Sequence, residues 1–193
     1  MSRSLPSMFA AMFLAVATAC GPGEPASEEA AARDTVAEAA PEAAPDTLAV
    51  AFLDRDGAEV GDAVVEGTPN GVLIRVRLDG VPPGVHAFHV HETGLCEPPF
   101  TSSGGHLAAE GSAHGFRSPG GPHAGDLPNV YVPESGKLRF DAFAGGLSRG
   151  GGGGGLALLD EDGAALVLHA GADDYATDPA GAAGERIACA VVR

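Results

Sequence analysis

Tryptophan is absent from this 193-residue chain, and tyrosine occurs only twice. A core must therefore be built mainly from small and β-branched side chains. Basic residues are also scarce, with 11 Lys and Arg against 26 Asp and Glu, so the formal net charge is -15. A chain this acidic, with no basic run, is expected to bind neither nucleic acid nor an anionic membrane surface as its main partner. Beyond the first 19 residues, no apolar run approaches the roughly 20 residues that a membrane-spanning helix needs.

The first 46 residues differ in composition from the rest of the chain. Residues 1–19 combine Arg3 with an apolar core of signal-peptide length, so we expect their removal on export. Cys20 follows small residues, which is typical of a lipoprotein signal whose cysteine becomes the lipidated N-terminus, although Ala17-Thr18-Ala19 suits ordinary signal peptidase equally. Residues 20–46 are rich in Ala, Pro and Glu and are predicted to form a disordered tether to a domain at 47–193.

Short apolar runs separated by Gly, Pro and Asp turns follow, and they indicate an all-β domain. Residues 72–78 show the pattern best, because alternate positions are apolar while Arg75 and Arg77 fall on the other face. We predict about eight strands, at 48–53, 60–66, 72–78, 85–91, 138–143, 156–159, 165–169 and 187–192. The long segment 94–133 lacks periodicity, and an irregular run of that length in a compact domain is usually functional.

All seven histidines lie after residue 85. His89 and His91 are two apart on a predicted strand, so their imidazoles share one face. Alone, such a pair is more often incidental than metal-binding. The following loop adds His106, His114, His123 and Asp126, and three imidazoles with one carboxylate would complete a tetrahedral zinc site. The alternative is a set of solvated histidines on a glycine-rich loop, which would leave that loop without a reason to order.

Five segments together carry a resemblance. They are Gly84-Val-His-Ala-Phe-His-Val-His-Glu92, Ser103-Gly-Gly-His106, Gly125-Asp-Leu127, His169-Ala-Gly-Ala-Asp173 and Gly184-Glu-Arg-Ile-Ala-Cys189. In this order they resemble the copper/zinc superoxide dismutase family, over roughly residues 48–192. The resemblance implies an immunoglobulin-like Greek-key sandwich, or flattened barrel, of antiparallel strands with long metal-binding and electrostatic loops.

The resemblance also implies site residues. Copper would be held by His89, His91, His106 and His169, and zinc by His106, His114, His123 and Asp126. His106 would bridge the two ions, because two adjacent divalent cations stabilise an imidazole that has lost both ring protons. Asp173 would orient one histidine of each metal, and His86 would brace the ligand strand. Cys96 and Cys189 would form a disulfide, although pairing of either with Cys20 is an alternative.

The implied activity is disproportionation of superoxide to oxygen and hydrogen peroxide by a redox-active copper. Arg186 would attract the anion to the copper, and His106 would deliver a proton. The alternative is a non-enzymatic, dismutase-like lipoprotein that binds copper and zinc as a chaperone or buffer. Export implies a periplasmic or cell-envelope location, with membrane contact only through the lipid anchor. A homodimer is compatible with the resemblance.

Overall fold

The computed structural model describes residues 46–152 and 154–193. The predicted signal peptide, Cys20 and nearly all of the tether lie outside these residues. The described part is all-β apart from one short 3-10 helix, η1 (Thr101–Ser103). Within this part, no helix has the length and apolar character needed to cross a membrane.

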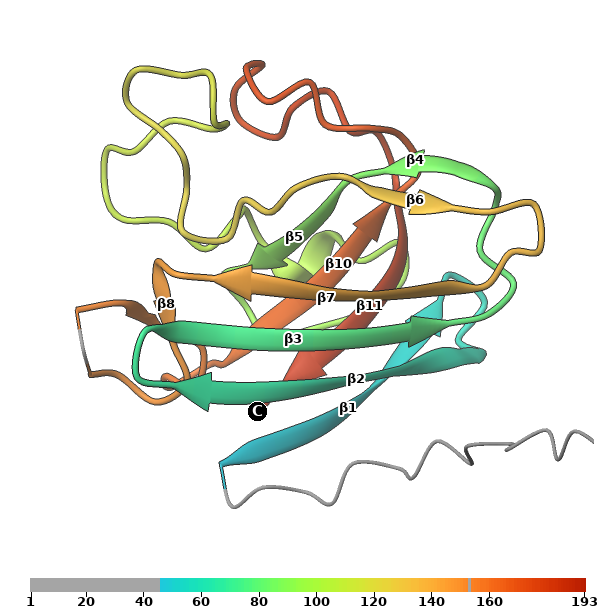
Figure 1. Cartoon of the computed structure of the whole chain (residues 1–193), viewed down its shortest axis with the longest axis horizontal. Coiled ribbons are helices and arrows are strands. Elements are labelled where there is room, and N and C mark those ends of the chain that lie inside the picture. The colour runs from blue at the N-terminus through green and yellow to red at the C-terminus, as the bar shows by residue number, and fades with distance from the viewer. Residues whose placement is uncertain (1–45, 153) are drawn as a thin grey trace, which may run out of the picture. The chain divides into compact units, whose positions relative to one another are not determined.

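A seven-stranded antiparallel sheet forms the body of the domain (Figure 1), in the order β5-β10-β11-β1-β2-β3-β7. Its strands are β1 (Thr47–Asp54), β2 (Glu59–Thr68), β3 (Gly71–Leu78), β5 (Phe88–His91), β7 (Leu138–Ala144), β10 (Ala164–His169) and β11 (Arg186–Val192). The alternation predicted for β3 is present, because Val72, Ile74, Val76 and Leu78 are buried. With Phe52 and Phe88 these side chains form one apolar core inside the curled sheet.

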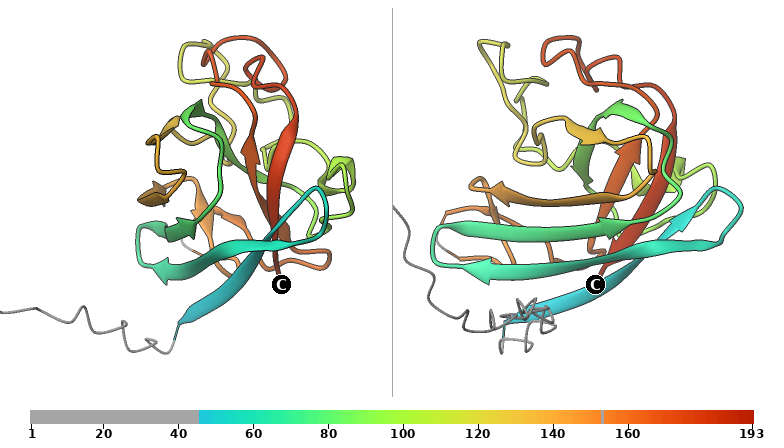
Figure 2. Two further views of the ribbon diagram at one scale, coloured as in Figure 1. Left: turned by 90° about the vertical axis from the view of Figure 1, so that its right-hand side faces the viewer. Right: turned by 45° about the vertical axis from the view of Figure 1, so that its right-hand side comes forward.

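A second ladder closes the curl. β4 (Gly84–His86), which leads into β5, pairs antiparallel with β6 (Val130–Val132), which leads into β7. The two edge strands of the large sheet are thus joined through their preceding segments, and Figure 2 shows the resulting flattened barrel from two further directions. The predicted all-β, Greek-key architecture is confirmed.

The strand predictions differ from the structure in three places. The strand predicted at 85–91 is divided at Ala87 into β4 and β5. β6 was missed because it lies in the aperiodic segment and is only three residues long. The strand predicted at 156–159 is the short β9 (Leu156–Ala157), and it pairs parallel with a missed strand, β8 (Leu147–Ser148). Such short ladders contain too few residues for a period to show in the sequence.

β5 separates the core from the functional site. Phe88 and Val90 join the apolar core, whereas His89 and His91 point to the other face, as the period of two predicts. On one edge β5 pairs with β10. On its other edge it meets residues 104–129, which we call the metal loop, through the bridges His91↔His106 and His89↔Asp126. Pairing to β5 therefore brings both ends of the metal loop to the two strand histidines.

Candidate metal centre

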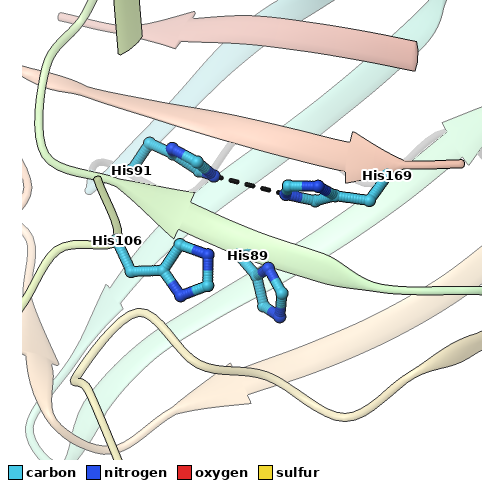
Figure 3. A group of neighbouring side chains, drawn as sticks. All are labelled: His89, His91, His106 and His169. Atoms are coloured by element: carbon cyan, nitrogen blue, oxygen red, sulfur yellow. Dashed lines mark hydrogen bonds between the residues drawn. The ribbon is translucent and has the colours of Figure 1, made fainter. Parts of the chain in front are cut away.

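Two groups of potential metal ligands lie side by side beneath the metal loop. The four-histidine set consists of His89, His91, His106 and His169, and the carboxylate set consists of His106, His114, His123 and Asp126. Within each set, the potential ligand atoms all lie within 4.8 Å of one another, and every residue is buried. Figure 3 shows the four-histidine set converging from β5, β10 and the metal loop. The structure thus brings together all seven residues that the sequence analysis predicted as ligands.

His91 and His169 face each other through their Nε2 atoms, and neither of these nitrogens carries a proton. His91 Nδ1 lies 3.0 Å from the carbonyl oxygen of Gly104, and His169 Nδ1 lies 3.3 Å from that of Gly184. A carbonyl can only accept, so the single N–H of each neutral ring is on Nδ1. The Nε2 atoms, 3.4 Å apart (Figure 3), therefore turn lone pairs toward each other. Two facing lone pairs repel each other, and a cation that binds both nitrogens would remove this repulsion.

The other two histidines of this set leave nitrogens without partners. His89 Nε2 donates to Asp173 Oδ2 at 3.0 Å, so its lone pair is on Nδ1. His89 Nδ1 and His106 Nε2 are buried and have no hydrogen-bond partner among the described residues. Buried polar atoms of folded proteins are normally paired, so these nitrogens indicate that a ligand belongs here.

In the carboxylate set, three imidazoles surround one oxygen. The Nδ1 atoms of His106, His114 and His123 lie 2.8, 3.1 and 3.4 Å from Asp126 Oδ1. His114 Nε2 donates to Asp173 Oδ1 at 2.9 Å, which leaves a lone pair on its Nδ1. The second oxygen, Asp126 Oδ2, accepts from the backbone N–H groups of Gly115 and His123, which fix the carboxylate. Three ring nitrogens thus converge on one carboxylate oxygen, which is how the donor atoms of a cation site are arranged.

Burial keeps the imidazoles neutral and ready to bind metal. Desolvation, followed by the charge of His106, lowers the pKa of His91 to about 2. Desolvation also lowers the pKa of His106 to about 4, although the hydrogen bond to Asp126 opposes this shift, and it lowers the pKa of His169 to about 3. For Asp126, desolvation raises the pKa, but hydrogen bonds from His106 and Gly115 outweigh it and bring the pKa to about 2.

The two donor sets fit the metals that the resemblance implies. Four imidazole nitrogens suit copper, and three imidazole nitrogens with one carboxylate oxygen suit tetrahedral zinc. His106 is common to both sets, with Nδ1 on the carboxylate side and the unpartnered Nε2 on the histidine side. This imidazole can therefore bind one cation through each nitrogen.

Asp173 and His86 occupy the supporting positions predicted for them. The Asp173 carboxylate spans the two sets, with one oxygen on His89 and the other on His114. Desolvation tends to raise the pKa of Asp173, but the hydrogen bonds from His89 and His114 keep it well below its usual value. His86 lies 2.8 Å from the carbonyl oxygens of both His169 and Pro82, and so ties β4 to the end of β10.

Arg186 is held close to the four-histidine set by three neutral acceptors. Its guanidinium donates to the carbonyl oxygens of Phe100 and Gly104 and to Ser103 Oγ, at 2.6, 2.7 and 3.0 Å. None of these acceptors carries charge, so they do not cancel the positive charge of the side chain. Arg186 also lines a surface recess of about 230 Å³ with Thr101 and the ion pair formed by Arg55 and Glu185.

The disulfide predicted between Cys96 and Cys189 is confirmed. Cys189 lies on β11 and packs with Phe100, Ala165 and Val167 in a small apolar cluster beneath the loop that begins at Cys96. This loop supplies all three acceptors of Arg186. The disulfide therefore fastens to β11 the segment that orients the arginine.

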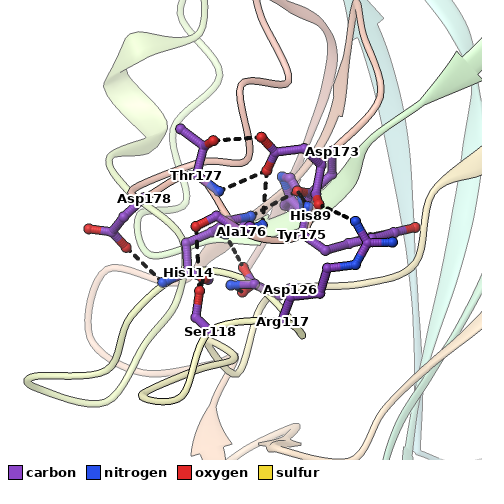
Figure 4. A network of polar contacts seen from close by, with 12 residues as sticks. His89, His114, Arg117, Ser118, Asp126, Asp173, Tyr175, Ala176, Thr177 and Asp178 are labelled. Carbon is purple, nitrogen blue, oxygen red and sulfur yellow. Dashed lines mark hydrogen bonds and ion pairs between the residues drawn. The ribbon is translucent and has the colours of Figure 1, made fainter.

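The sequence analysis missed four residues that shape the centre. Gly104 contributes its carbonyl oxygen to both His91 and Arg186. Asp178 accepts the backbone N–H of His114 at 2.7 Å, and Asn129 and Tyr175 contact Asp173 (Figure 4). A backbone carbonyl has no sequence signal. The roles of Asn129 and Tyr175 could not be predicted from the sequence, because each contacts residues that lie more than 40 positions away along the chain.

Comparison with known proteins gives consistent matches. Residues 60–192 match the sequence profile of a family described as copper/zinc superoxide dismutase (SODC). The chain is 44% identical over 144 residues to Cu-Zn superoxide dismutase 2 of Aquifex aeolicus, covering 74% of this chain and 84% of that protein. It is 40% identical over 140 residues to the Cu-Zn superoxide dismutase of Caulobacter vibrioides, covering 72% and 80%.

Solved structures show the same likeness. A SOD-like protein from Bacillus subtilis superimposes with a TM-score of 0.70 at 38% identity, covering 75% of this chain and 97% of that one. The Cu/Zn superoxide dismutase from Brucella abortus superimposes with a TM-score of 0.60 at 29% identity, covering 77% and 100%. The similarity therefore extends over nearly the whole length of both solved chains.

Proposed function

The chain belongs to the copper/zinc superoxide dismutase family, and on this premise we propose that it is an enzyme that disproportionates superoxide. The observation that carries the proposal is the completeness of the centre. Both donor sets are present, they share His106, and Arg186 lies beside the four-histidine set. A dismutase-like protein that only binds metal would not need an arginine held in this way.

When bound, copper held by the four-histidine set would supply one-electron redox chemistry, and zinc held by the carboxylate set would polarise His106. The residues around the metals do the remaining work. Asp173 fixes the rings of His89 and His114, so that their nitrogens keep their positions between the two half-reactions. A rigid ligand set of this kind lowers the reorganisation that each electron transfer requires.

Arg186 attracts the substrate. The domain is acidic overall, so its general field repels an anion, and local positive charge at the site must overcome this repulsion. The guanidinium is half-buried and held by neutral acceptors beside the four-histidine set. An anion approaching the set therefore meets a fixed positive charge.

His106 supplies a proton. Reduction of the second superoxide to hydrogen peroxide requires one electron and two protons, and oxidation of the first releases oxygen without consuming protons. His106 Nε2 faces the four-histidine set, while Nδ1 stays on the Asp126 side. When copper is reduced, Nε2 would leave it and take up a proton from solvent, and it would donate this proton to the reduced second superoxide as it binds copper again. Solvent supplies the other proton.

Activity measured with defined metal content tests this proposal. We expect the chain loaded with copper and zinc to dismute superoxide far faster than the chain loaded with zinc alone, and cyanide to inhibit it. Metal analysis of the same samples would show both ions bound. If the chain binds both metals but dismutes superoxide no faster than the chain loaded with zinc alone, the result would support the buffering or chaperone function instead.

We also propose that the enzyme acts outside the cytoplasm, in the periplasm or cell envelope, where it protects against superoxide. The signal-like residues 1–19 and the lipobox-like Cys20 support this proposal, as does the confirmed disulfide, since disulfides persist in oxidising compartments. Mass spectrometry of the mature N-terminus would distinguish lipidated Cys20 from a simple cleavage product. The homodimer stays a prediction, which sedimentation of the metal-loaded protein would test.

A further inference from the structure

The metal loop meets a second loop, residues 170–185 between β10 and β11, on the side of the centre away from the core. The two loops lie side by side in Figures 1 and 2. Tyr175 joins them through hydrogen bonds to Arg117 and Asn129. Its carbonyl oxygen accepts the N–H of Arg117 at 3.0 Å, and its hydroxyl accepts the N–H of Asn129 at 2.8 Å. Its own N–H donates to Asp173 Oδ1 at 2.6 Å. One residue thus contacts the middle of the metal loop, its last residue and the Asp173 carboxylate.

Asn129 fixes the backbone of Asp173. Its side-chain amide donates to the Asp173 carbonyl oxygen at 2.8 Å, and its Oδ1 accepts the Asp173 N–H at 2.8 Å. This reciprocal pair leaves the Asp173 main chain little freedom to rotate. Because Tyr175 accepts the Asn129 N–H in turn, Asn129, Asp173 and Tyr175 form a closed set of hydrogen bonds.

The geometry of Tyr175 is specialised for this junction. Its φ is 63°, a left-handed conformation that is uncommon for a residue with a side chain. Its backbone approaches the metal loop so closely that a Cβ on Gly115 would lie 2.1 Å from its carbonyl oxygen. The ring also packs on Phe116, with centroids 5.3 Å apart, and beneath the guanidinium of Arg117. A conformation held from so many sides is fixed by the surrounding structure.

We propose that Tyr175 and Asn129 are positioning residues that aim the Asp173 carboxylate at His89 and His114, and thereby set the geometry of both metals. The inference rests on the proposed function for the identity of the metals. Neither residue touches a ligand nitrogen. Each acts through Asp173, which Figure 4 labels among the polar contacts between the two loops. A change at Tyr175 therefore reaches the two metal sets together.

Tyr175→Phe tests the proposal with little disturbance. It removes only the hydroxyl and leaves the partly buried Asn129 N–H without its acceptor. Tyr131→Phe is the matched control, because Tyr131 is the only other tyrosine and its side chain is exposed on β6. We expect the Tyr175 variant of the full chain to release cobalt(II), used as a probe in the zinc site, about threefold to tenfold faster to a chelator. The Tyr131 variant should match the unchanged chain.

Spectroscopy separates positioning from simple loss of stability. If Tyr175 positions Asp173, both the visible absorption of bound cobalt and the electron paramagnetic resonance of bound copper should change in Tyr175→Phe. A purely structural role would lower the melting temperature but leave the spectra of the retained metals unchanged, and that result would overturn the inference. Asn129→Ala should change the same two spectra in the same direction. Should it not fold, Asn129→Ser, which keeps a hydroxyl near Asp173, takes its place.

The outcomes also separate this inference from the proposed function. Unchanged spectra and release rates in an active copper and zinc enzyme would reject the positioning role alone. Failure of the unchanged chain to bind copper and zinc would reject the proposed function, and the inference with it.

Discussion

His91 and Arg186 donate to the same atom, the carbonyl oxygen of Gly104, at 3.0 and 2.7 Å. One peptide group therefore sets the orientation of a predicted copper ligand and of the charge that we propose attracts superoxide. The guanidinium also reaches Phe100, so its fork shape holds two carbonyls at once. The guanidinium of Arg186 and the ring of His91 are thus linked by hydrogen bonds to one shared oxygen.

Replacing Arg186 by Ile should lower the rate of superoxide dismutation by about tenfold or more and flatten its dependence on salt, because the local attraction for the anion is lost. Both metals should stay bound, as Arg186 is not a ligand. Pulse radiolysis at several ionic strengths, with metal analysis, measures this. Arg193→Ile is the control, since Arg193 is an exposed residue that contacts only Asp162 in its hydrogen bonds. Equal rates in the two variants would contradict the role of Arg186.

His106 and His123 should behave differently when each is changed to Ala. His123 belongs to the carboxylate set alone, so its loss should weaken zinc binding by about 10- to 100-fold and leave copper bound. His106 belongs to both sets, so its loss should weaken zinc binding and also alter the copper spectrum. Metal titrations and electron paramagnetic resonance of both variants provide the comparison. Identical copper spectra would show that His106 does not join the two sets.

Two glycines of the 170–185 loop offer a matched test of the Asp173 carboxylate. Both have positive φ, so Ala at either position adds backbone strain of about 1 kcal/mol. A Cβ on Gly181 would lie 1.8 Å from Asp173 Oδ1, whereas a Cβ on Gly184 would meet nothing within 4 Å. Gly181→Ala should therefore displace the carboxylate and lower zinc affinity by about 10-fold. Gly184→Ala should leave zinc affinity unchanged, because the Gly184 carbonyl contacts His169, which is not in the carboxylate set. Similar zinc affinities in the two variants would count against the role of Asp173.

Changing both Cys96 and Cys189 to Ser should destabilise the domain. The disulfide joins residues 93 positions apart, and the chain-entropy model gives about 4 to 5 kcal/mol for a loop of this size. The segment that orients Arg186 would also be released from β11, so activity should fall more than metal content. Urea unfolding and activity assays of the variant and of the reduced protein measure both effects. A midpoint equal to that of the disulfide-bonded protein would exclude a stabilising role.

The metal-free domain should lose stability on acidification. Burial lowers the pKa of His106 to about 4 and that of His169 to about 3, both from an ordinary value of 6.5. Between these values the unfolded chain binds more protons than the folded one, so this contribution is complete above 6.5 and disappears as the pH falls toward 3 to 4. Asp126, with a pKa lowered to about 2, acts in the same direction at lower pH.

Thermal melting of the metal-free protein from about pH 8 down to about pH 4 should show a falling midpoint below about pH 6.5. The metal-loaded protein should resist acid better, because the metals occupy the nitrogens that protons would otherwise take. A midpoint that stays level in the metal-free protein would show that these imidazoles are not buried as neutral groups.

Much of this centre could be predicted from the sequence, because its ligands are side chains in short, recognisable segments. The strand period places His89 and His91 on one face without any knowledge of the fold. Three loop histidines and Asp126 then indicated a zinc site, and the family resemblance added His169, the disulfide and Arg186. β3 was predictable for the same reason, since burial of one face alone sets its alternation.

The tertiary structure decided what joins these pieces. β4 and β6 are three residues each and exist because they pair across the barrel, a condition that no local period reports. The Gly104 carbonyl, Asn129 and Tyr175 act through hydrogen bonds between residues 13 to 82 positions apart, and Tyr175 also through a left-handed backbone conformation. Their residue types alone do not indicate such roles. The sequence by itself determined which atoms can bind metal, because that is a property of side-chain chemistry. Their orientation depends on the folded chain, because the groups that hold them become neighbours only on folding.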